Sequence, residues 1–184
     1  MMEDVFSGGF ADAPAQSAEA FRRALDAMAR PGTLHDLAAA RAPSPLSDAA
    51  ATLLLTLTDT TTPVHLAGAH DAKALRDWIG FHTGAPLSGA EGAMFAVGTW
   101  DALCPLDRFA VGDPEYPDRS ATLIVELAEF GPPTHRLTGP GIAGAVTAHL
   151  PGARRAAFPL GLDLFLTCGA RMSALPRSTR LEAL

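Results

Sequence analysis

The stretch 112–119 holds the densest set of groups that could do chemistry. Three carboxylates, those of Asp113, Glu115 and Asp118, surround Tyr116, and two prolines brace the segment. Carboxylates at this spacing can bind a divalent cation or act as acid and base, although an exposed, proline-braced turn explains them more often. A partner-contact loop is a third interpretation, because a tyrosine on a pre-ordered loop provides contact area at little entropic cost. Tyr116, Glu115 and Asp118 are therefore the partner-contact candidates.

A second concentration of chemistry lies towards the C-terminus. Five arginines follow residue 152, against Asp163 and Glu182, while the whole chain has a formal net charge of −6. Arginine forks match phosphate oxygens, which makes Arg171 and Arg177 candidates for anion binding. Asp163 lies in an apolar run, where a buried charge needs a partner. If the last apolar runs form a hairpin, Arg177 falls beside it, and we predict a structural ion pair rather than a catalytic acid.

Other patterns lack the context that their chemistry needs. The sequence 139–144 spells G-x-G-x-x-G after a predicted strand, with Asp163 near the distance of a ribose-binding acid. A helix after it must stop by Pro151, too early for a crossover, so a glycine-rich strand-to-helix turn is the better interpretation. The single lysine, Lys73, is flanked by Asp71 and Arg76 in a predicted helix, which favours a solvated amine over a Schiff-base lysine.

The remaining reactive side chains show no assembled site. The six histidines have no metal-ligand spacing such as HExxH, and the residues around Ser88 do not form a G-x-S-x-G elbow. We therefore predict no catalytic residue, no metal and no cofactor. The negative net charge also disfavours nucleic acid and anionic membrane surfaces as partners, since both attract clustered lysine and arginine.

The first element expected is a helix that runs to Arg30, with Asp12 as its cap and a proline in its first turn. Phe21, Leu25 and Met28 recur at i, i+4 and i+7, and this spacing predicts that they share one buried stripe. The sequence thus indicates an amphipathic helix that packs through its large apolar side chains.

Further elements follow from apolar periodicity, caps and turn residues. Helices are expected from Ser47 to about Thr58, from a cap at Asp71 to Gly84, and over 100–109 with an interruption near Pro105. Strands are expected over 63–66, 94–97, 121–127, 134–138, 162–167 and 172–175, the last two joined as a hairpin. The run 121–127 suits the centre of a sheet. Interleaved helices and strands predict one α/β domain over 1–184, three-layered, with a mixed sheet and helices on both faces.

Size and composition limit the number of domains and the compartment in which the protein can work. A chain of 184 residues, 48% of them hydrophobic, can bury one sizeable core. Its two cysteines lie far apart without CxxC spacing, which indicates a reducing cytoplasm rather than a disulfide framework. The acidic N-terminal residues do not resemble a secretory signal, and no apolar run reaches the length of a membrane span. A surplus of apolar residues over a filled core favours a homodimer.

Several segments, in order, resemble the PhnH family, the H subunits of the bacterial carbon-phosphorus lyase machinery that breaks down phosphonates. They are Phe21-Arg22-Arg23, Ala27-Met28, Pro31-Gly32, 54–59, 62–64, 81–87, 121–124, 136–139, Gly141-Ile142, 158–169 and Pro176-Arg177. The resemblance spans nearly the whole chain, and 158–169 is its most specific part.

This resemblance implies a three-layer α/β/α fold similar to that of pyridoxal-phosphate-dependent transferases without the cofactor machinery, and homodimers. It also implies assembly with the G, I and J subunits into the complex that makes ribose 1-methylphosphonate 5-triphosphate from ATP and phosphonate, after which the carbon-phosphorus bond is cleaved. The chain is then a non-catalytic subunit. The alternative is a phosphate- or nucleotide-binding enzyme subunit that uses the C-terminal arginines.

Overall fold

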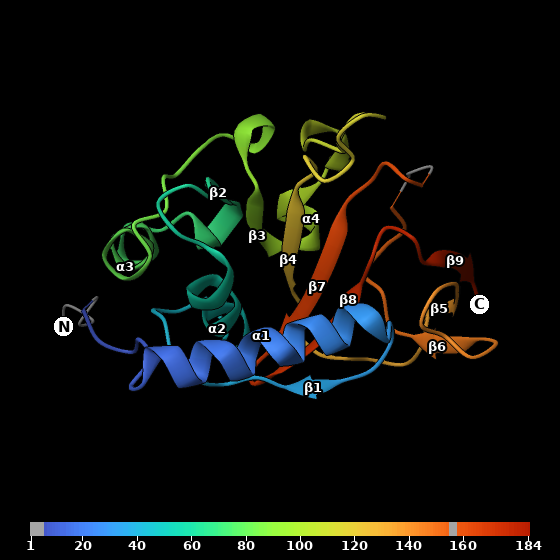
Figure 1. Cartoon of the computed structure of the whole chain (residues 1–184), viewed down its shortest axis with the longest axis horizontal. Helices are drawn as coiled ribbons and strands as arrows, with labels where there is room; N and C mark the ends of the chain where they lie inside the picture. The colour runs from blue at the N-terminus through green and yellow to red at the C-terminus, as the bar shows by residue number, and fades with distance from the viewer. Residues whose placement is uncertain (1–5, 155–157) are drawn as a thin grey trace.

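The structure, a computed structural model, describes residues 6–154 and 158–184 (Figure 1). The helices are α1 (Ala13–Ala29), α2 (Asp48–Leu57), α3 (Lys73–His82) and α4 (Trp100–Leu103), with short 3-10 turns η1 (Gly68–His70), η2 (Ala90–Gly92) and η3 (Leu106–Arg108). The strands are β1 (His35–Asp36), β2 (Val64–Leu66), β3 (Phe95–Thr99), β4 (Thr122–Glu126), β5 (His135–Thr138), β6 (Val146–Ala148), β7 (Asp163–Cys168), β8 (Arg171–Leu175) and β9 (Arg180–Ala183).

Six strands form a mixed sheet in the order β1-β8-β7-β4-β3-β2. The strands β2, β3, β4 and β7 run parallel, while β8 and β1 are antiparallel to their neighbours. The β-branched and apolar run in β4 lies inside the sheet, and β7 and β8 form a hairpin around the turn at Gly169. The mixed α/β class, the central strand and the C-terminal hairpin are therefore confirmed.

A second, three-stranded sheet has the order β6-β5-β9. The turn after β5 does not lead into a helix, so the predicted strand-to-helix turn is wrong. Gly139, Gly141 and Gly144 all have positive φ, which suits a turn, and the β-branched Val146 and Thr147 then continue as β6. The strand β9 was not predicted, because its short charged sequence carries no clear alternation.

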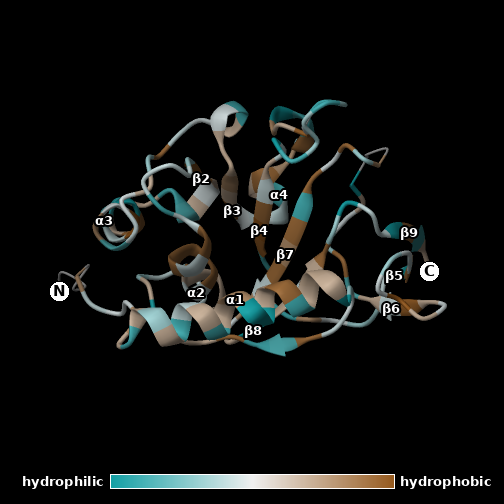
Figure 2. Ribbon diagram, viewed as in Figure 1, coloured by the Kyte–Doolittle hydropathy of each residue, from teal (hydrophilic) through white to brown (hydrophobic). Residues whose placement is uncertain are grey.

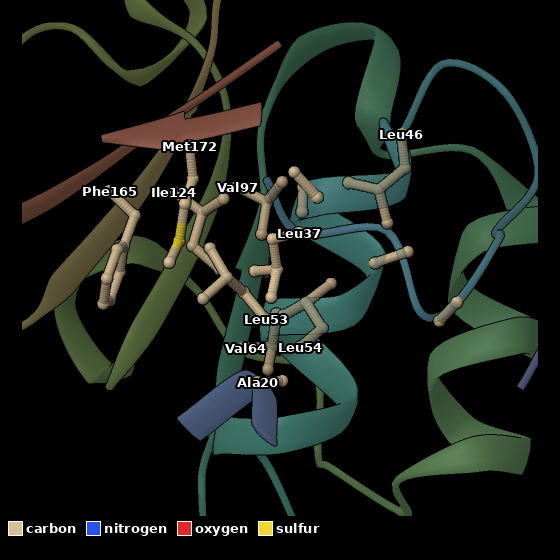
Figure 3. Close-up of a cluster of buried hydrophobic side chains, with 14 of the residues drawn as sticks. Ala20, Leu37, Leu46, Leu53, Leu54, Val64, Val97, Ile124, Phe165 and Met172 are labelled. Carbon is tan, nitrogen blue, oxygen red and sulfur yellow. The ribbon is translucent and has the colours of Figure 1, made fainter. Parts of the chain in front are cut away.

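The large sheet separates two apolar clusters. Ile124 of β4 points into a cluster formed with α1, α2 and α3, whereas its neighbours Leu123 and Val125 point into a second cluster with α4 and β5. Figure 3 shows Ile124 with Val97, Phe165 and side chains of α2 in the first cluster. In Figure 2 the hydrophobic colour accordingly follows the central strands and α2.

Helix starts follow the expected caps in two cases out of three. The Asp12 carboxylate accepts a hydrogen bond from the N–H of Ala15, and Ser47 caps α2 through the N–H of Ala50. The predicted cap at Asp71 is wrong: Ala72 is the N-cap of α3. Asp71 instead forms an ion pair with Arg76, which draws its carboxylate away from the start of the helix.

The prediction for the buried face of α1 is wrong for Phe21 and Leu25, whereas Met28 is partly buried and packs against the first core cluster. The side chains packed inside are Ala20, Ala24 and Ala27, while Phe21 is 51% exposed and Leu25 is 59% exposed. The alanines also recur at i, i+4 and i+7, so the helix contains two apolar stripes. The close approach of α1 to α2 and β8 selects the stripe with the smaller side chains.

The helix expected over 100–109 is shorter than predicted. The helix α4 ends at Leu103, and the 3-10 turn Leu106–Arg108 follows beyond Pro105. Proline has no N–H to donate, which explains the break at that residue. Among the helices of the described residues, none is both long enough and apolar enough to cross a membrane.

Candidate functional site

A cleft opens at the amino end of β7, between the large sheet and the three-stranded sheet. Its volume is about 820 Å³, and its lining includes three arginines. The lining residues are Gly139, Pro140, Arg154, Phe158, Arg177, Ser178, Thr179, Arg180 and Leu181. The β5–β6 turn and the segment that leads from β8 into β9 therefore form most of its wall.

The ion pair predicted from the sequence lies at this cleft. Asp163 is the first residue of β7, and its Oδ2 is 2.6 Å from Nη2 of Arg177 and 3.1 Å from Nε. The Oδ1 atom accepts a further hydrogen bond from the backbone N–H of Arg177 at 2.6 Å. The two side chains are only 21% and 16% exposed. This two-pronged contact fixes the chain beyond β8 to the start of β7.

Arg177 also holds the loop 112–119. Its Nη1 donates a hydrogen bond to the carbonyl oxygen of Pro117. Within the loop, the Asp113 carboxylate accepts hydrogen bonds from the N–H groups of Glu115 and Tyr116, at 3.0 and 2.8 Å. The loop is therefore an ordered turn whose geometry depends on Asp113.

The predicted contact residues lie on the outside of this loop. Tyr116 is 44% exposed, and the guanidinium of Arg119 stacks over its ring at 3.9 Å from the centroid. Glu115 and Asp118 are exposed as well. No group of three or more potential metal ligands occurs in the described parts of the chain, and this loop is no exception. The side chains of Glu115, Tyr116 and Asp118 are therefore exposed to solvent on an ordered loop.

Arg154 is the central structural residue of the cleft. Its guanidinium donates hydrogen bonds to the carbonyl oxygens of Leu162, Leu175, Pro176 and Thr179. Burial lowers the pKa of Arg154 to about 10, and the nearby charge of Asp163 opposes this shift. Arg154 thus remains charged at neutral pH and ties the ends of β7 and β8 to the start of β9.

Arg180 is the cleft arginine whose side chain is free. It is exposed, and its guanidinium makes no hydrogen bond or ion pair with any residue that the structure describes. Asp163 balances one of the three arginine charges, so the cleft has a local excess of two positive charges on a negatively charged protein. Arg154 and Arg180 were not singled out from the sequence, since the arginine excess did not show which residues face one another.

Arg171 lies at the opposite end of β8. It is paired in register with Cys168, and its guanidinium is 5.5 Å from the ring centroid of Phe130. Arg177, at the other end, has three of its nitrogens engaged by Asp163 and Pro117. The structure therefore does not bring the two predicted anion-binding arginines together.

The carboxyl end of the parallel strands contains a different buried group. Oε1 of Glu126 accepts a hydrogen bond from the N–H of Ser47 at 2.7 Å, and Oε2 accepts one from the Thr167 hydroxyl at 3.1 Å. Burial raises the pKa of the Glu126 carboxyl, and these hydrogen bonds oppose the shift. The sequence did not indicate this contact, because it joins residues 79 positions apart.

Two further ionisable residues, Lys73 and His70, lie outside the cleft, one exposed and one buried. Lys73 is 86% exposed and pairs with Asp77 one turn later in α3. His70, in η1, is 3% exposed, and neither of its ring nitrogens has a partner among the residues of 6–154 and 158–184. Burial lowers the pKa of His70, so its neutral form is favoured.

The fold and the site define a class: a mixed-sheet α/β protein with a basic cleft that is lined by one ion pair and two further arginines. Comparison with known sequences names the family. Residues 8–182 match the family model described as "Bacterial phosphonate metabolism protein (PhnH)". The chain belongs to the PhnH family.

Two relatives are similar to this chain along almost their full length. A protein of Rhizobium meliloti (strain 1021), described as "Alpha-D-ribose 1-methylphosphonate 5-triphosphate synthase subunit PhnH", is 40% identical over 97% of this chain and 96% of its own length. A protein of Stutzerimonas stutzeri, described as "Putative C-P lyase subunit protein HtxG", is 29% identical over 95% of both chains. Both descriptions are of subunits.

Proposed function

We propose that this chain is a non-catalytic subunit of the enzyme complex that makes ribose 1-methylphosphonate 5-triphosphate during phosphonate breakdown. The observation that carries the proposal is the 40% identity, over 97% of the chain, to a relative described as that subunit. The site agrees with this role, because the buried charges of Asp163, Arg177 and Arg154 hold the fold together instead of facing a common reaction centre.

The proposal includes the setting and the partners that the family resemblance implies. We infer a homodimer in the cytoplasm that assembles with the G, I and J subunits and has neither nucleic acid nor membrane as a partner. The two cysteines, both free, fit a reducing compartment. We also infer the three-layer architecture of pyridoxal-phosphate-dependent transferases without the cofactor, since helices pack on one face of the sheet and α4 lies on the other.

The first test is turnover by the purified chain. We expect no loss of ATP and no ribosylated product when the isolated protein is incubated with ATP and methylphosphonate. The same assay with the co-expressed subunits should form product. Robust turnover by the isolated chain would show that it is an enzyme in its own right.

The loop 112–119 is the proposed contact surface for the other subunits. Tyr116→Ala removes the exposed ring on which Arg119 stacks and should reduce co-purification of tagged G, I and J subunits. Tyr116→Phe keeps the ring and should retain them. If the alanine variant co-purifies as well as the unchanged protein, this loop is not the contact surface.

A second candidate function is binding of a phosphate group or nucleotide in the cleft. The observation that favours it is the free guanidinium of Arg180 in a cleft with excess positive charge. Calorimetry with ATP and with ribose 5-phosphate should detect binding that Arg180→Ala weakens about tenfold. Arg171→Ala, at the far end of β8, is the matched control. Absence of heat at millimolar ligand would remove this candidate.

A further inference from the structure

The outer face of α1 carries an apolar stripe that the other residues of 6–154 and 158–184 leave largely uncovered. Pro14, Ala18, Phe21 and Leu25 are exposed on it, and Met28, at its end, is partly buried. The intervals between these residues alternate between four and three, which is the spacing of the a and d positions of a heptad. Such a stripe forms the seam along which one helix packs against another.

Apart from Met28, which packs against the first core cluster, the fold does not use this stripe. The helix packs against α2 and β8 through Ala20, Ala24 and Ala27, which lie about a third of a turn round the helix from the stripe. Figure 1 shows α1 as the front element, with no helix or strand drawn over its outer side. Two large apolar side chains one turn apart at 51% and 59% exposure therefore need an explanation outside the described chain.

Arg22 is the charged residue of α1 that borders the stripe, whereas the other charges of the helix lie on its far side. Glu19 pairs with Arg23 at 2.7 Å, and Asp26 pairs with Arg30, so these charges are balanced within α1. Arg22 is exposed, at helical spacing from Ala18 and Leu25 of the stripe, and its guanidinium has no hydrogen-bond or ion-pair partner in the described part of the chain. A partner molecule with a carboxylate opposite Arg22 would balance this remaining charge of α1.

The extent of the stripe argues against a second copy of α1 as the occupant. Given about 200 Å² for a complete aromatic side chain, the exposed parts of Phe21, Leu25 and their small neighbours amount to on the order of 300 Å². A stable interface needs about 800 Å² from each partner. In addition, an antiparallel pairing that sets Phe21 of each copy against Leu25 of the other would bring the two Arg22 guanidinium groups face to face.

We propose that α1 docks an amphipathic helix of another subunit of the complex, one with an apolar heptad seam and a carboxylate that meets Arg22. The small area is then sufficient, because the partner is also held elsewhere in the assembly. This inference rests on the proposed function, which supplies a multi-subunit complex, and adds a contact surface distinct from the loop around Tyr116.

The test is co-purification of the full-length chain with co-expressed G, I and J subunits. The double variant Phe21→Ser/Leu25→Ser removes the stripe, and Arg22→Glu reverses the charge beside it. Met94→Ser, at a residue that is 48% exposed and precedes β3, is the matched control for loss of an exposed apolar side chain. Thermal unfolding of each isolated variant checks its folding, and Arg22→Glu provides the result if the double variant does not fold.

We expect both α1 variants to lose at least tenfold in co-purified subunits while Met94→Ser retains them. Full retention by the α1 variants would overturn the inference and leave the subunit role intact. If light scattering shows instead that the α1 variants turn a dimer into a monomer while the other subunits remain bound, the occupant is a second copy and the inference is wrong. If even the unchanged chain recovers no subunits, the proposed function fails, and the inference fails with it.

Discussion

The two ends of the large sheet bury ionisable groups in opposite ways. At the amino end, Asp163 and Arg177 form an ion pair, and the guanidinium of Arg154 donates to four carbonyl oxygens. At the carboxyl end, Glu126 and His70 have shifted pKa values that favour their neutral forms. The amino end thus gives its buried ionic groups ion-pair and hydrogen-bond partners, whereas at the carboxyl end burial shifts the pKa values of Glu126 and His70 against their charged forms.

The candidate site lies at the end of the sheet opposite to the one where ligands usually bind. In open sheets with parallel strands, ligands bind outside the carboxyl ends of the strands. Here the start of α2 lies against that end and is joined to it by the contact between Ser47 and Glu126. The basic cleft lies at the amino end, beside Asp163. Fold class alone would therefore direct a search for ligands to the end of the sheet opposite the basic cleft.

Replacement of Arg154 should have the largest effect on the free energy of unfolding. Arg154→Met keeps the aliphatic stem but leaves four carbonyl oxygens without their charged donor, and it should lower the free energy of unfolding by about 3 kcal/mol. Urea unfolding followed by circular dichroism measures this change. Arg41→Met, at a side chain that is 82% exposed, should change it by less than about 0.5 kcal/mol. Equal effects would show that the amino end does not depend on its buried charge.

The ion pair should have the next largest effect. Asp163→Asn removes the negative charge and leaves Arg177 mostly buried beside a neutral amide, which should cost about 2 kcal/mol of unfolding free energy. A double-mutant cycle with Arg177→Met should give a coupling energy above about 1 kcal/mol. Additive single effects would mean that the two residues stabilise the fold independently.

At the carboxyl end, Glu126 allows a test of whether burial disfavours a charged side chain. Glu126→Ala leaves the N–H of Ser47 without its acceptor and should cost about 1–2 kcal/mol. Because burial raises the pKa of Glu126, the folded protein binds this proton more tightly than the unfolded chain, and stability falls as the pH rises above the usual glutamate range. Glu126→Gln should therefore gain stability relative to the unchanged protein between about pH 4 and pH 7. Parallel pH profiles would contradict this assignment.

The smallest expected effect is at His70. Burial lowers its pKa, so the stability that its neutral form provides is present above about pH 6.5 and is lost as the pH falls. His70→Leu should flatten the decline in unfolding free energy between about pH 6.5 and pH 5, by less than about 1 kcal/mol. The same substitution at His149, a less buried histidine, provides the comparison. An unchanged slope in the His70 variant would exclude this source of acid sensitivity.

The sequence predicted those features that depend on neighbouring residues. The caps at Asp12 and Ser47, the central strand β4 and the β7–β8 hairpin follow from local patterns, and the proximity of Asp163 to Arg177 follows from the hairpin. Features that depend on tertiary packing were missed. Among these are Glu126, whose partners are distant in sequence, and Arg154, which was one arginine among five.

The outer face of α1 illustrates why periodicity has a limit. The stripes that begin at Ala20 and at Phe21 have the same spacing, and hydrophobicity favours the larger residues. The choice between them depends on the distance between α1 and its neighbours, and this distance is set by the size of the side chains in the contact. The sequence therefore predicted the helix correctly and its buried face wrongly.

The hydrogen bond from Arg177 to Pro117 has a thermodynamic consequence for any molecule that binds nearby. One guanidinium belongs both to the lining of the cleft and to the anchor of the loop that carries Tyr116. An anion that drew Arg177 away from Pro117 would loosen this loop, while a protein bound to the loop would hold Arg177 in place. The two binding events would then be linked by a coupling free energy, and each would change the affinity of the other by the same factor.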